Sequence, residues 1–558
     1  MIDLEIPVGK RALKYRLFEM LPGALSYTAL GLMVVLSFIS PLLAAIYLLL
    51  VVITLLVKAA TIAFHTIKGN RRLQRAQQVP WDKRLAELDD AEKAYEHHSL
   101  GRPPKEFGAR VHIENLRLVS ADQDAYPKPS QLYNAVIMAA YNEPYDILQP
   151  SIQAVLDTTY DNQRIIFILA YEARGGEVME EIAQRLQKEF GSKFKAFHIV
   201  KHPADLPNEV RGKGGNITYA GRFLKQWLDD EAIEYKNVIV TTLDSDNRPH
   251  RYYFDCLTYE YIIHEDRKHL SYQPVALFLN NIWDAPALMR VIATGNSFWN
   301  IISSMRPHVL RNFAAHAQPM EALVEMDFWS TRTITEDGHQ FWRSYFYFNG
   351  NYQVVPLYMP VYQDAVLAET YLRTMKAQFL QLRRWTYGAS DVPYVGVRIF
   401  DKNRTVPFWK SLAYLIRLVD GHVTWATVSI LVAFGAWVPL LINPDAYNDV
   451  VAHQLPDLIS RLQQVALIGL FVTVFLSFKM LPPRPARYRR HRTVLMVAQW
   501  FLMPLSSVVY NSLTALYSQS RLFFGVYLEN FDVTVKATHG IQQQHKQQMK
   551  EERLKRTK

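Results

Sequence analysis

Cysteine is almost missing from this sequence, because Cys256 is the single example among 558 residues. One thiol cannot form an internal disulfide framework, so the sequence gives no sign of an oxidising compartment. A lone cysteine can serve as a nucleophile, but we interpret Cys256 as a structural residue. We also expect no signal peptide, since the first apolar run is too long and ends without a small-residue cleavage site.

Charge is absent from several long stretches, which predicts membrane-spanning helices. Residues 21–57 carry no charge, and a spanning helix needs about 20 apolar residues. This first run therefore predicts two helices that fold back at Ser40-Pro41. Three more uncharged runs predict a third, a fourth and a fifth span: residues 422–442, 462–478 and 493–520.

The net charge of +10 is concentrated in short clusters of Lys and Arg beside these runs. This distribution favours a membrane surface over nucleic acid as the partner. Positive charge marks the cytoplasmic side of a membrane protein, which places the N-terminus, residues 70–405 and the loop 479–492 in the cytoplasm. The basic tail belongs there too, and this requires an even number of crossings.

Five runs give an odd number of crossings, and two solutions remain open. Either the last run forms a re-entrant hairpin at Pro504, or one tilted helix leaves the tail outside. As a single helix, residues 493–520 would be about 42 Å long, which is long for one crossing and short for two. We favour the hairpin because a motif in the tail, described below, belongs on the cytoplasmic side.

The block between the second and third spans alternates between strand and helix patterns. Residues 66–130 are mostly polar and include a solvated helix over 80–98. After them, continuous apolar runs end in polar residues, as is typical of buried parallel strands. We therefore predict an α/β sheet of parallel strands, with strands at 134–142, 163–171, 195–200 and 235–244 and helices at 177–190 and 215–229.

Polar side chains follow three of these strands, at the edge where parallel α/β sheets bind ligands. Tyr141 and Glu143 follow the first strand, Glu172 ends the second, and Asp-Ser-Asp (244–246) ends the fourth. Asp-Ser-Asp is common in turns, but two carboxylates at the end of a buried strand suit Mg²⁺ or Mn²⁺. Such an ion would neutralise a diphosphate leaving group.

Three further motifs each allow a structural and a chemical interpretation. A Gly-rich loop with Arg211 and Lys213 opens a helix, whose free N–H groups favour anions. Thr-Glu-Asp (335–337) fits a helix cap, and a carboxylate there also fits a general base for an acceptor hydroxyl. Gln-x-x-Arg-Trp (381–385) fits a helix resting on the membrane, or a pocket wall where Trp stacks on a sugar and Arg pairs with phosphate.

Together these motifs resemble the membrane-embedded family 2 glycosyltransferases, the group that contains bacterial cellulose synthase and hyaluronan synthase. The resemblance covers residues 130–390 and the flanking spans. Each motif is short, but six in the family's order between membrane spans are hard to obtain by chance. They are AAYNEP (139–144), RGKGGN (211–216), DSD (244–246), QP (273–274), TED (335–337) and QLRRW (381–385).

The resemblance implies a donor site and a catalytic base. The nucleotide sugar would be bound by residues at the strand ends and in the Gly-rich loop: Tyr141, Glu143, Glu172, Lys213 and Asp244. Asp246, with Asp244, would ligate Mg²⁺ or Mn²⁺. Asp337 would be the base, with Glu336 beside it in the catalytic motif. Many relatives end the second strand on paired aspartates, so Glu172 leaves the identity of the nucleotide base open.

The resemblance also implies an acceptor side of the site. The segment FDVTVK (531–536) is similar to the cytoplasmic gating loop of cellulose synthases. This similarity also requires the tail to lie inside the cell, which is why we favour the hairpin at Pro504. The diphosphate and the acceptor would be bound by residues of this loop and of the Gln-x-x-Arg-Trp helix: Gln381, Arg384, Trp385, Thr534 and Lys536.

The implied protein is a multi-pass enzyme of the cell membrane with a cytoplasmic GT-A domain, an α/β Rossmann-like fold inserted between transmembrane helices. It would transfer a sugar with inversion, and the Gln-x-x-Arg-Trp motif and the C-terminal spans favour a growing polysaccharide as acceptor. A lipid acceptor, polyprenyl phosphate or a glycolipid, is the alternative within the enzyme class. A membrane scaffold with a decayed transferase domain is the alternative outside it, and the altered second strand supports it.

We expect five units along the chain. They are a cytoplasmic stub with two transmembrane helices (1–65), a cytoplasmic helical lead-in (66–130), the GT-A domain with interfacial helices (131–400), an interfacial helix with the C-terminal transmembrane helices (401–520), and the gating-loop-like segment with the basic tail (521–558). Partner subunits are not indicated by any motif.

Overall fold

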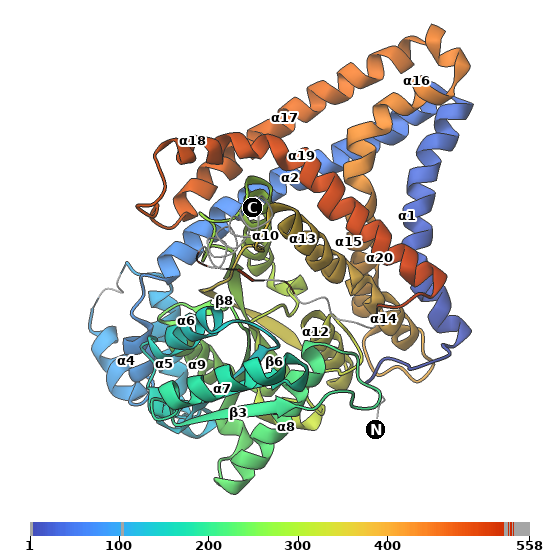
Figure 1. The fold of residues 1–558 in the computed structure, drawn as a ribbon. Helices are drawn as coiled ribbons and strands as arrows, with labels where there is room; N and C mark the ends of the chain where they lie inside the picture. The colour runs from blue at the N-terminus through green and yellow to red at the C-terminus, as the bar shows by residue number, and fades with distance from the viewer. Residues whose placement is uncertain (1–3, 102–104, 529–533, 535, 538–539, 541–558) are drawn as a thin grey trace, which may run out of the picture.

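The structure, a computed structural model, describes residues 4–101, 105–528, 534, 536, 537 and 540; the side chains of 447, 465–468, 470 and 473 are not included. It consists of a mixed α/β sheet domain flanked by long apolar helices from both ends of the chain (Figure 1). The first two helices precede the sheet domain, and the later helices return to pack beside them. Segments far apart in the sequence therefore share one helical layer.

The N-terminal run forms two helices, α1 (Leu13–Ile39) and α2 (Pro41–Ala76), as predicted. Ser40 between them has an extended backbone, with φ −161° and ψ 124°. Pro41 begins α2, a position where the missing N–H costs no helical hydrogen bond. Within the described residues, four helical stretches are long and apolar enough to cross a membrane: Leu13–Ile39, Pro41–Ala76, Phe408–Ile442 and His491–Phe524.

The third predicted span corresponds to α15 (Phe408–Phe434) and α16 (Val438–Ile442), and the fourth lies within α17 (Val450–Met480). The predicted hairpin at Pro504 is wrong. Helical segments follow one another from His491 to Phe524 without a reversal, and Pro504 sits in the first turn of one of them, where proline is tolerated. The segments are α18 (His491–Ala498), a 3₁₀ turn (Gln499–Leu502), α19 (Met503–Ser506), a π turn (Ser507–Ser512) and α20 (Leu513–Phe524).

The helical lead-in differs from its prediction. The single helix expected over 80–98 is two helices, α3 (Trp81–Ala86) and α4 (Ala91–Ser99). Asp90 separates them because its side chain accepts a hydrogen bond from Lys93 N at 3.4 Å, which caps a new helix start. A third helix, α5 (Ala109–Ala121), completes this group beside the sheet domain (Figure 1).

The sheet begins with the four predicted strands, β1 (Tyr133–Ala140), β2 (Ile165–Glu172), β3 (Ala196–His202) and β4 (Val238–Asp244), which pair in parallel. The predicted helices are α7 (Gly176–Phe190) and α8 (Lys213–Asp230). The full sheet is mixed, with order β3-β2-β1-β4-β7-β6-β8-β5, because β7 runs antiparallel to β4. The added strands are β5 (Arg248–Pro249), β6 (Leu270–Leu277), β7 (Ala317–Pro319) and β8 (Gln353–Tyr362).

The remaining helices of the sheet domain cover its faces and connect it to the helical layer. They are α6 (Tyr145–Leu156), α9 (Tyr253–Ile263), α10 (Ala287–Ser304), α11 (Met320–Glu325), α12 (Glu336–Tyr347), α13 (Tyr371–Thr386) and α14 (Asp391–Ile399).

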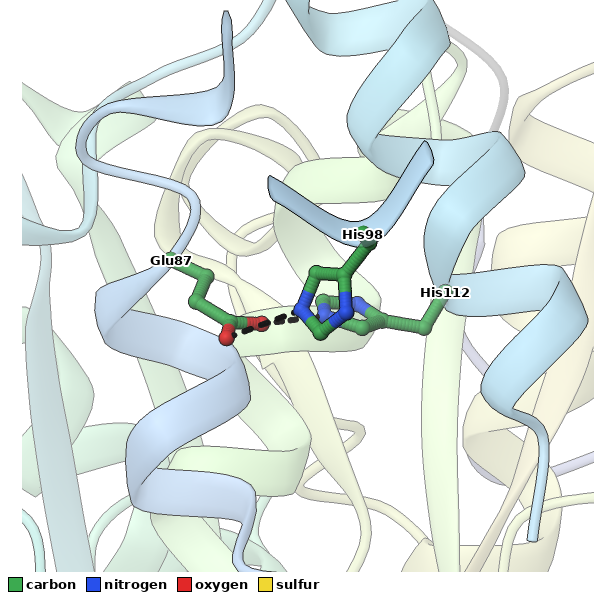
Figure 2. Close-up of side chains that lie close together, drawn as sticks. All are labelled: Glu87, His98 and His112. Atoms are coloured by element: carbon green, nitrogen blue, oxygen red, sulfur yellow. Dashed lines mark hydrogen bonds and ion pairs between the residues drawn. The ribbon is translucent and has the colours of Figure 1, made fainter. Parts of the chain in front are cut away.

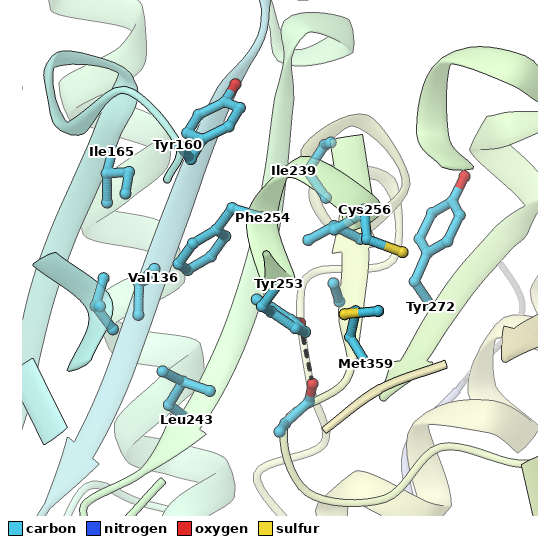
Figure 3. Close-up of a cluster of buried hydrophobic side chains, with 14 of the residues drawn as sticks. Val136, Tyr160, Ile165, Ile239, Leu243, Tyr253, Phe254, Cys256, Tyr272 and Met359 are labelled. Carbon is cyan, nitrogen blue, oxygen red and sulfur yellow. Dashed lines mark hydrogen bonds between the residues drawn. The ribbon is translucent and has the colours of Figure 1, made fainter. Parts of the chain in front are cut away.

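Cys256 belongs to the main core, between the sheet and α9 (Figure 3). Tyr253 in the same helix anchors this layer, since its hydroxyl donates to the Ala315 carbonyl at 3.4 Å. Burial raises the pKa of the Cys256 thiol well above its usual value, so it remains protonated and unreactive. The environment of this thiol fits the structural interpretation.

Candidate active site

The sheet register gathers the predicted strand-end residues at one edge. Asp244, the last residue of β4, lies level with Ala139 of β1, and Ala140 lies level with Tyr171 of β2. The polar residues that follow these strands therefore emerge side by side, as parallel pairing requires. Asp244 is half-buried there, and Asp246 in the following turn is buried.

Lys213 joins two of the predicted acidic motifs. Its Nζ lies 2.9 Å from Asp244 Oδ1 and 3.0 Å from Asp337 Oδ2, although 93 residues separate Asp244 from Asp337 in the sequence. Lys213 is the first residue of α8, as the Gly-rich motif predicts. Gly214 allows this approach, because a Cβ at that position would lie 2.4 Å from the Ser330 carbonyl oxygen.

The charges around Lys213 support ion pairs at neutral pH. Burial would lower the pKa of the Lys213 ammonium, but Asp244 and Asp337 outweigh it and raise that pKa. Burial would likewise raise the pKa of Asp244, but Lys213 and then Lys536 lower it to about 2. A buried lysine between two carboxylates is a site where an incoming anion or cation would change the pairing.

The side chain of Lys536, from the C-terminal segment, reaches the turn after β4. Its Nζ donates to Ser245 Oγ at 2.7 Å and to Asp246 Oδ1 at 2.9 Å. Burial would lower its pKa, but Asp246, Glu143 and Asp244 raise it, which brings Glu143 into the same group of charges.

The segment carrying Lys536 is held beside the strand-end edge by the backbone. Lys536 pairs with Leu367, and Ala537 N donates to Leu367 O at 2.9 Å. Thr534 presents a buried hydroxyl that has no hydrogen-bond partner in the described residues. The other residues of FDVTVK lie outside the described residues.

The predicted catalytic pair begins α12. Asp337 retains 18% of its side-chain exposure, whereas Glu336 retains 4%. Burial, followed by the negative charge of Asp337, raises the pKa of Glu336 to about 8. Glu336 Oε2 is buried without a hydrogen-bond partner among the described residues. The two neighbouring carboxyl groups therefore differ: burial favours the protonated form of Glu336, which lies 3.8 Å from Lys213, whereas Asp337 is more exposed and pairs with Lys213 at 3.0 Å.

The Gln-x-x-Arg-Trp residues lie on α13. This helix lies between the helical layer and the charged group of Lys213, Asp244, Asp246 and Asp337, which we call the cleft. Arg384 is close enough to act on the charges of Asp244 and Glu336: it adds to the lowering of the Asp244 pKa and partly opposes the rise of the Glu336 pKa. Trp385 packs against Phe278, with ring centroids 6.1 Å apart. Gln381 Oε1 accepts a hydrogen bond from the Gln378 amide at 3.0 Å.

The end of α13 contacts α20. Thr386 Oγ1 lies 2.9 Å from Ser518 Oγ of α20. Residues of the same last turn of α13 thus serve both interpretations offered by its sequence: Arg384 acts on the charges of the cleft, and Thr386 contacts α20.

Of the residues expected to bind the nucleotide sugar, Tyr141 and Glu143 contact each other, and Glu172 has partners of its own. Glu143 Oε2 accepts a hydrogen bond from Tyr141 N at 2.7 Å. Glu172 pairs with Arg174 at 2.8 Å and with His202 Nδ1 at 3.4 Å. Burial would lower the pKa of His202, but Glu172 and Glu209 raise it to about 9. Glu172 is therefore engaged by cations of its own rather than by Lys213.

Two residues of the cleft escaped the sequence prediction. Asp364 N donates to Asp246 Oδ2 at 3.0 Å, and Asp364 Oδ1 is buried with no hydrogen-bond partner among the described residues. Burial and then Asp246 raise the pKa of Asp364 to about 7. Asp364 follows the end of β8, so the strand-end rule that found Asp244 would have found it if β8 had been recognised.

His316 is the second missed residue, and no sequence pattern marks it. It is buried, with Nδ1 3.6 Å from Asp337 Oδ1. Trp329 donates to its Nε2 at 3.1 Å, so Nδ1 carries the proton and donates to Phe313 O at 2.9 Å. Burial lowers the pKa of His316, which keeps the ring neutral beside Asp337.

The carboxyl groups of the cleft match a hard divalent cation in the type of ligand atom that they offer. Asp246 and Asp364 are adjacent, and Asp364 Oδ1 is a buried oxygen without a partner in the described chain. Carboxylate oxygens are the ligands that Mg²⁺ and Mn²⁺ prefer. Lys536 pairs with Asp246 at 2.9 Å. A metal ion that binds Asp246 would therefore displace this ammonium group.

No family model matches this chain, and no curated protein matches it. Among solved structures, the mannosyltransferase PcManGT of Pyrobaculum calidifontis, in complex with GDP-Man and Mn²⁺, is 12% identical with a TM-score of 0.39; the match covers 85% of this chain and 100% of that one. Residues 1–349 of S. aureus TarS, in complex with UDP-GlcNAc, are 10% identical with a TM-score of 0.36, over 71% and 93% of the two chains. GalNAc-T7 with UDP, GalNAc and Mn²⁺ is 12% identical with a TM-score of 0.32, over 52% and 58%. Because these TM-scores are below 0.5, the interpretation of the cleft rests on its own residues.

Proposed function

We propose that the protein is a membrane glycosyltransferase that moves a sugar from a nucleotide-sugar donor to an acceptor hydroxyl with inversion. The single observation that carries this proposal is the contact of Lys213 with both Asp244 and Asp337 at the carboxyl ends of the parallel strands. It joins the Gly-rich, Asp-Ser-Asp and Thr-Glu-Asp motifs in one cleft. Chemically, the cleft offers cations for a diphosphate and a carboxylate for a proton.

The donor diphosphate has three basic groups available. Lys213 and Lys536 are paired with carboxylates. A diphosphate would compete with these carboxylates for the lysines, while its metal ion would bind the carboxylates. Arg384 on α13 supplies the third positive charge. Asp246, with Asp244 and Asp364, would hold Mg²⁺ or Mn²⁺. When bound, such an ion neutralises the charge that develops on the leaving diphosphate. Charge-assisted contacts from the lysines would align the donor for in-line attack.

Asp337 is the better of the two candidate bases. A carboxylate must be ionised and reachable to accept a proton, and Asp337 is the more exposed member of the pair. The acceptor hydroxyl oxygen forms a bond to the anomeric carbon while the bond from that carbon to the diphosphate oxygen breaks. The hydroxyl proton moves to Asp337, and the nucleoside diphosphate leaves with the electron pair. Neutral Glu336, with an unpartnered oxygen, is suited to donate a hydrogen bond.

The remaining predicted residues are assigned by position. Tyr141 and Glu143 adjoin Lys536 and would contact the nucleotide, while Glu172 would help to shape the base pocket through Arg174. An acceptor group is proposed for the α13 side of the cleft and the tail segment: Gln381, Trp385 and Thr534.

We further propose that α1, α2, α15 and α17 cross the membrane and that α18–α20 lies along its cytoplasmic boundary. Both ends of this last stretch contact the domain side of the protein. Near its start, Arg487 pairs with Asp284 at 2.8 Å, and near its end the Leu522 carbonyl accepts a hydrogen bond at 2.9 Å from Arg16, in the first turn of α1. In Figure 1 the stretch runs across the direction of α2 and α17.

Four crossings would resolve the odd count of apolar runs. They return the chain to the cytoplasmic side, where the basic loop 479–492 also belongs by the distribution of positive charge. Lys536 can then reach the cleft without a further crossing. The five units expected from the sequence are proposed with the same boundaries, with 401–520 holding two crossings and the boundary helix.

A growing polysaccharide is the proposed acceptor, and a lipid is the second candidate. The position of α13 between the cleft and α20 supports an acceptor that reaches the cleft from the membrane side. This arrangement suits a polymer passing toward the helices and also a lipid-linked hydroxyl. A decayed scaffold is disfavoured, because the cleft retains the acidic and basic groups that transfer requires.

The test uses the purified chain in detergent with a panel of radiolabelled nucleotide sugars and either Mg²⁺ or Mn²⁺. We expect one donor to give metal-dependent release of nucleoside diphosphate, and Asp246→Ala to abolish it while still inserting in membranes. Labelled product of high mass on a gel identifies a polymer, whereas label extracted into organic solvent identifies a lipid acceptor. Absence of turnover with every donor, in native membranes as well, would leave the scaffold interpretation.

A further inference from the structure

Glu87, His98 and His112 form a compact cluster outside the cleft (Figure 2). Glu87 follows α3, His98 lies in the last turn of α4, and His112 lies in α5. Glu87 uses one carboxylate oxygen for each imidazole: Oε1 is 3.1 Å from His98 Nε2, and Oε2 is 2.6 Å from His112 Nε2. One carboxylate thus links three short helices.

We propose that these three side chains bind a zinc ion. Their ligand atoms lie within 4.8 Å of one another. Two imidazole nitrogens and a carboxylate oxygen belong to the usual zinc ligands, and ligands of a tetrahedral zinc ion are about 3.3 Å apart. The distance of 3.1 Å between His98 Nε2 and Glu87 Oε1 is close to this spacing, whereas the 2.6 Å between His112 Nε2 and Glu87 Oε2 is shorter and would have to lengthen. Small side-chain rotations are therefore enough to place the ion between the three groups.

The surroundings of His112 favour the proton arrangement that a metal ligand needs. Its Nδ1 lies 2.9 Å from the Tyr259 hydroxyl oxygen, which also accepts a hydrogen bond from the Asn115 amide at 3.0 Å. With Nδ1–H donating to this oxygen, the lone pair of Nε2 would be available to a metal ion in place of the hydrogen bond to Glu87. A second hydrogen bond of this kind fixes the tautomer and orientation of metal-binding histidines.

The exposure of the cluster leaves room for a fourth ligand. His112 is buried, with 5% side-chain exposure, whereas Glu87 and His98 retain 33% and 21%. The open side faces solvent, so water can complete a tetrahedral site. A metal ion also has a structural task here: α4, described over its whole length, buries only Ala91. Ala94 and Tyr95 add only partly buried contacts with the core, and a metal ion would add a cross-link between α4 and α5.

The zinc site is independent of the glycosyltransfer proposal and can be separated from the metal of the cleft. The cleft offers carboxylate oxygens, which suit Mg²⁺ and Mn²⁺, whereas two imidazoles favour Zn²⁺. The site would connect the lead-in helices to the sheet domain through Tyr259, which lies in α9. Its role is thus to fix α4 and α5 on the domain that follows.

The experiment measures zinc binding by the full-length chain, purified in nanodiscs without a polyhistidine tag and stripped with a chelator. Zinc alone is the ligand, and the bound metal per chain and the thermal midpoint are the readouts. We expect one tightly bound zinc ion per chain and a higher midpoint with zinc. Using Asp246→Ala as the background removes the metal of the cleft from the count.

The neighbouring histidines supply the matched control. His98→Ala should weaken zinc binding by more than about 100-fold, the upper range reported even for groups that only support a metal ligand. His97→Ala, at an exposed position in the same helical turn, should bind zinc like the parent chain. Equal thermal midpoints of both variants in chelator establish that His98→Ala is folded. The proposal is overturned if the parent chain takes up no zinc, or if His98→Ala retains it.

Discussion

The catalytic cleft and the Glu87–His98–His112 cluster are two polar groups built on different principles. The cleft collects charges from strand ends and from the tail, and its carboxylates are compensated by Lys213 and Lys536. The cluster draws on three helices within 26 residues, and its carboxylate is compensated by imidazoles. Ammonium groups on long side chains can give way to a diphosphate and its cation. The imidazoles, one of them fixed by Tyr259, are arranged to stay in place.

The largest expected effect is the loss of sugar transfer when the proposed base in the cleft is replaced by a side chain of the same shape. Asp337→Asn preserves shape and removes the base, so transfer should fall by about 10²- to 10⁴-fold. Asp327→Asn, at an exposed aspartate paired with Arg222, is the matched control and should leave the rate unchanged. Labelled sugar transfer with purified protein is the measurement. Comparable activity of the two variants would remove Asp337 from the proposed chemistry.

A smaller effect tests whether the tail belongs to the cleft. Lys536→Ala removes an ammonium group that would pair with the donor diphosphate, so the KM for the donor should rise by about 10- to 100-fold, as expected for one charge-assisted contact. Lys225→Ala removes an exposed lysine that pairs with Asp229 on α8 and serves as control. A KM unchanged from the parent would show that the segment only rests on the domain.

The corresponding test of the cluster removes one hydrogen bond. Tyr259→Phe deletes the hydroxyl beside His112 Nδ1 and should weaken zinc affinity by about tenfold, at the low end for such supporting groups. Sugar transfer should not change. Zinc titration of the two chains checks the affinity, and an unaltered value would mean that the tyrosine does not orient His112.

The pH dependence of stability should have opposite signs in the two regions. The pKa of Glu336 is raised from 4.5 to about 8 in the folded protein. Its protonation therefore contributes fully to the free energy of unfolding below pH 4.5, and this contribution is lost as the pH rises to 8. The hydrogen bond from His112 lowers the pKa of Glu87 to about 2, which implies stability that is present above pH 4.5 and lost as pH falls through 2.

Glu336→Gln should therefore flatten the decline of unfolding free energy between pH 4.5 and 8, by up to about 1.4 kcal/mol per pH unit for one group. Thermal unfolding of both chains across this range is the measurement. The same slope in both chains would mean that Glu336 is ionised in the folded protein.

The sequence predicts much of the sheet and the cleft, but it does not predict the Glu87–His98–His112 cluster. β1 to β4 were recognisable because buried parallel strands are continuous apolar runs, and the strand-end rule then located Asp244 and Glu143. The short strands β5 and β7 carry no such run, and prolines interrupt β6 and β8 (Pro274, Pro356 and Pro360), which argues against strands in a sequence. The mixed part of the sheet and Asp364 after β8 were therefore missed. His316 is placed by tertiary packing alone.

The cluster was not foreseen because its ligands share no helical face or motif spacing. Glu87, His98 and His112 approach only because α3, α4 and α5 turn back on one another. The break at Asp90 that permits this was hidden in a stretch expected to be one helix. Sequence periodicity finds elements more readily than the turns that set their mutual positions.

The most direct test of the central claim is the position of Mn²⁺ in a structure of the full chain with nucleoside diphosphate, located by anomalous scattering. We expect the ion within about 2.5 Å of an Asp246 carboxylate oxygen, with the diphosphate contacting Lys213 or Lys536 and Asp337 facing the vacant sugar position. Manganese and nucleotide bound away from the Asp244–Asp246 turn, or Asp337 separated from them, would contradict the proposed glycosyltransferase.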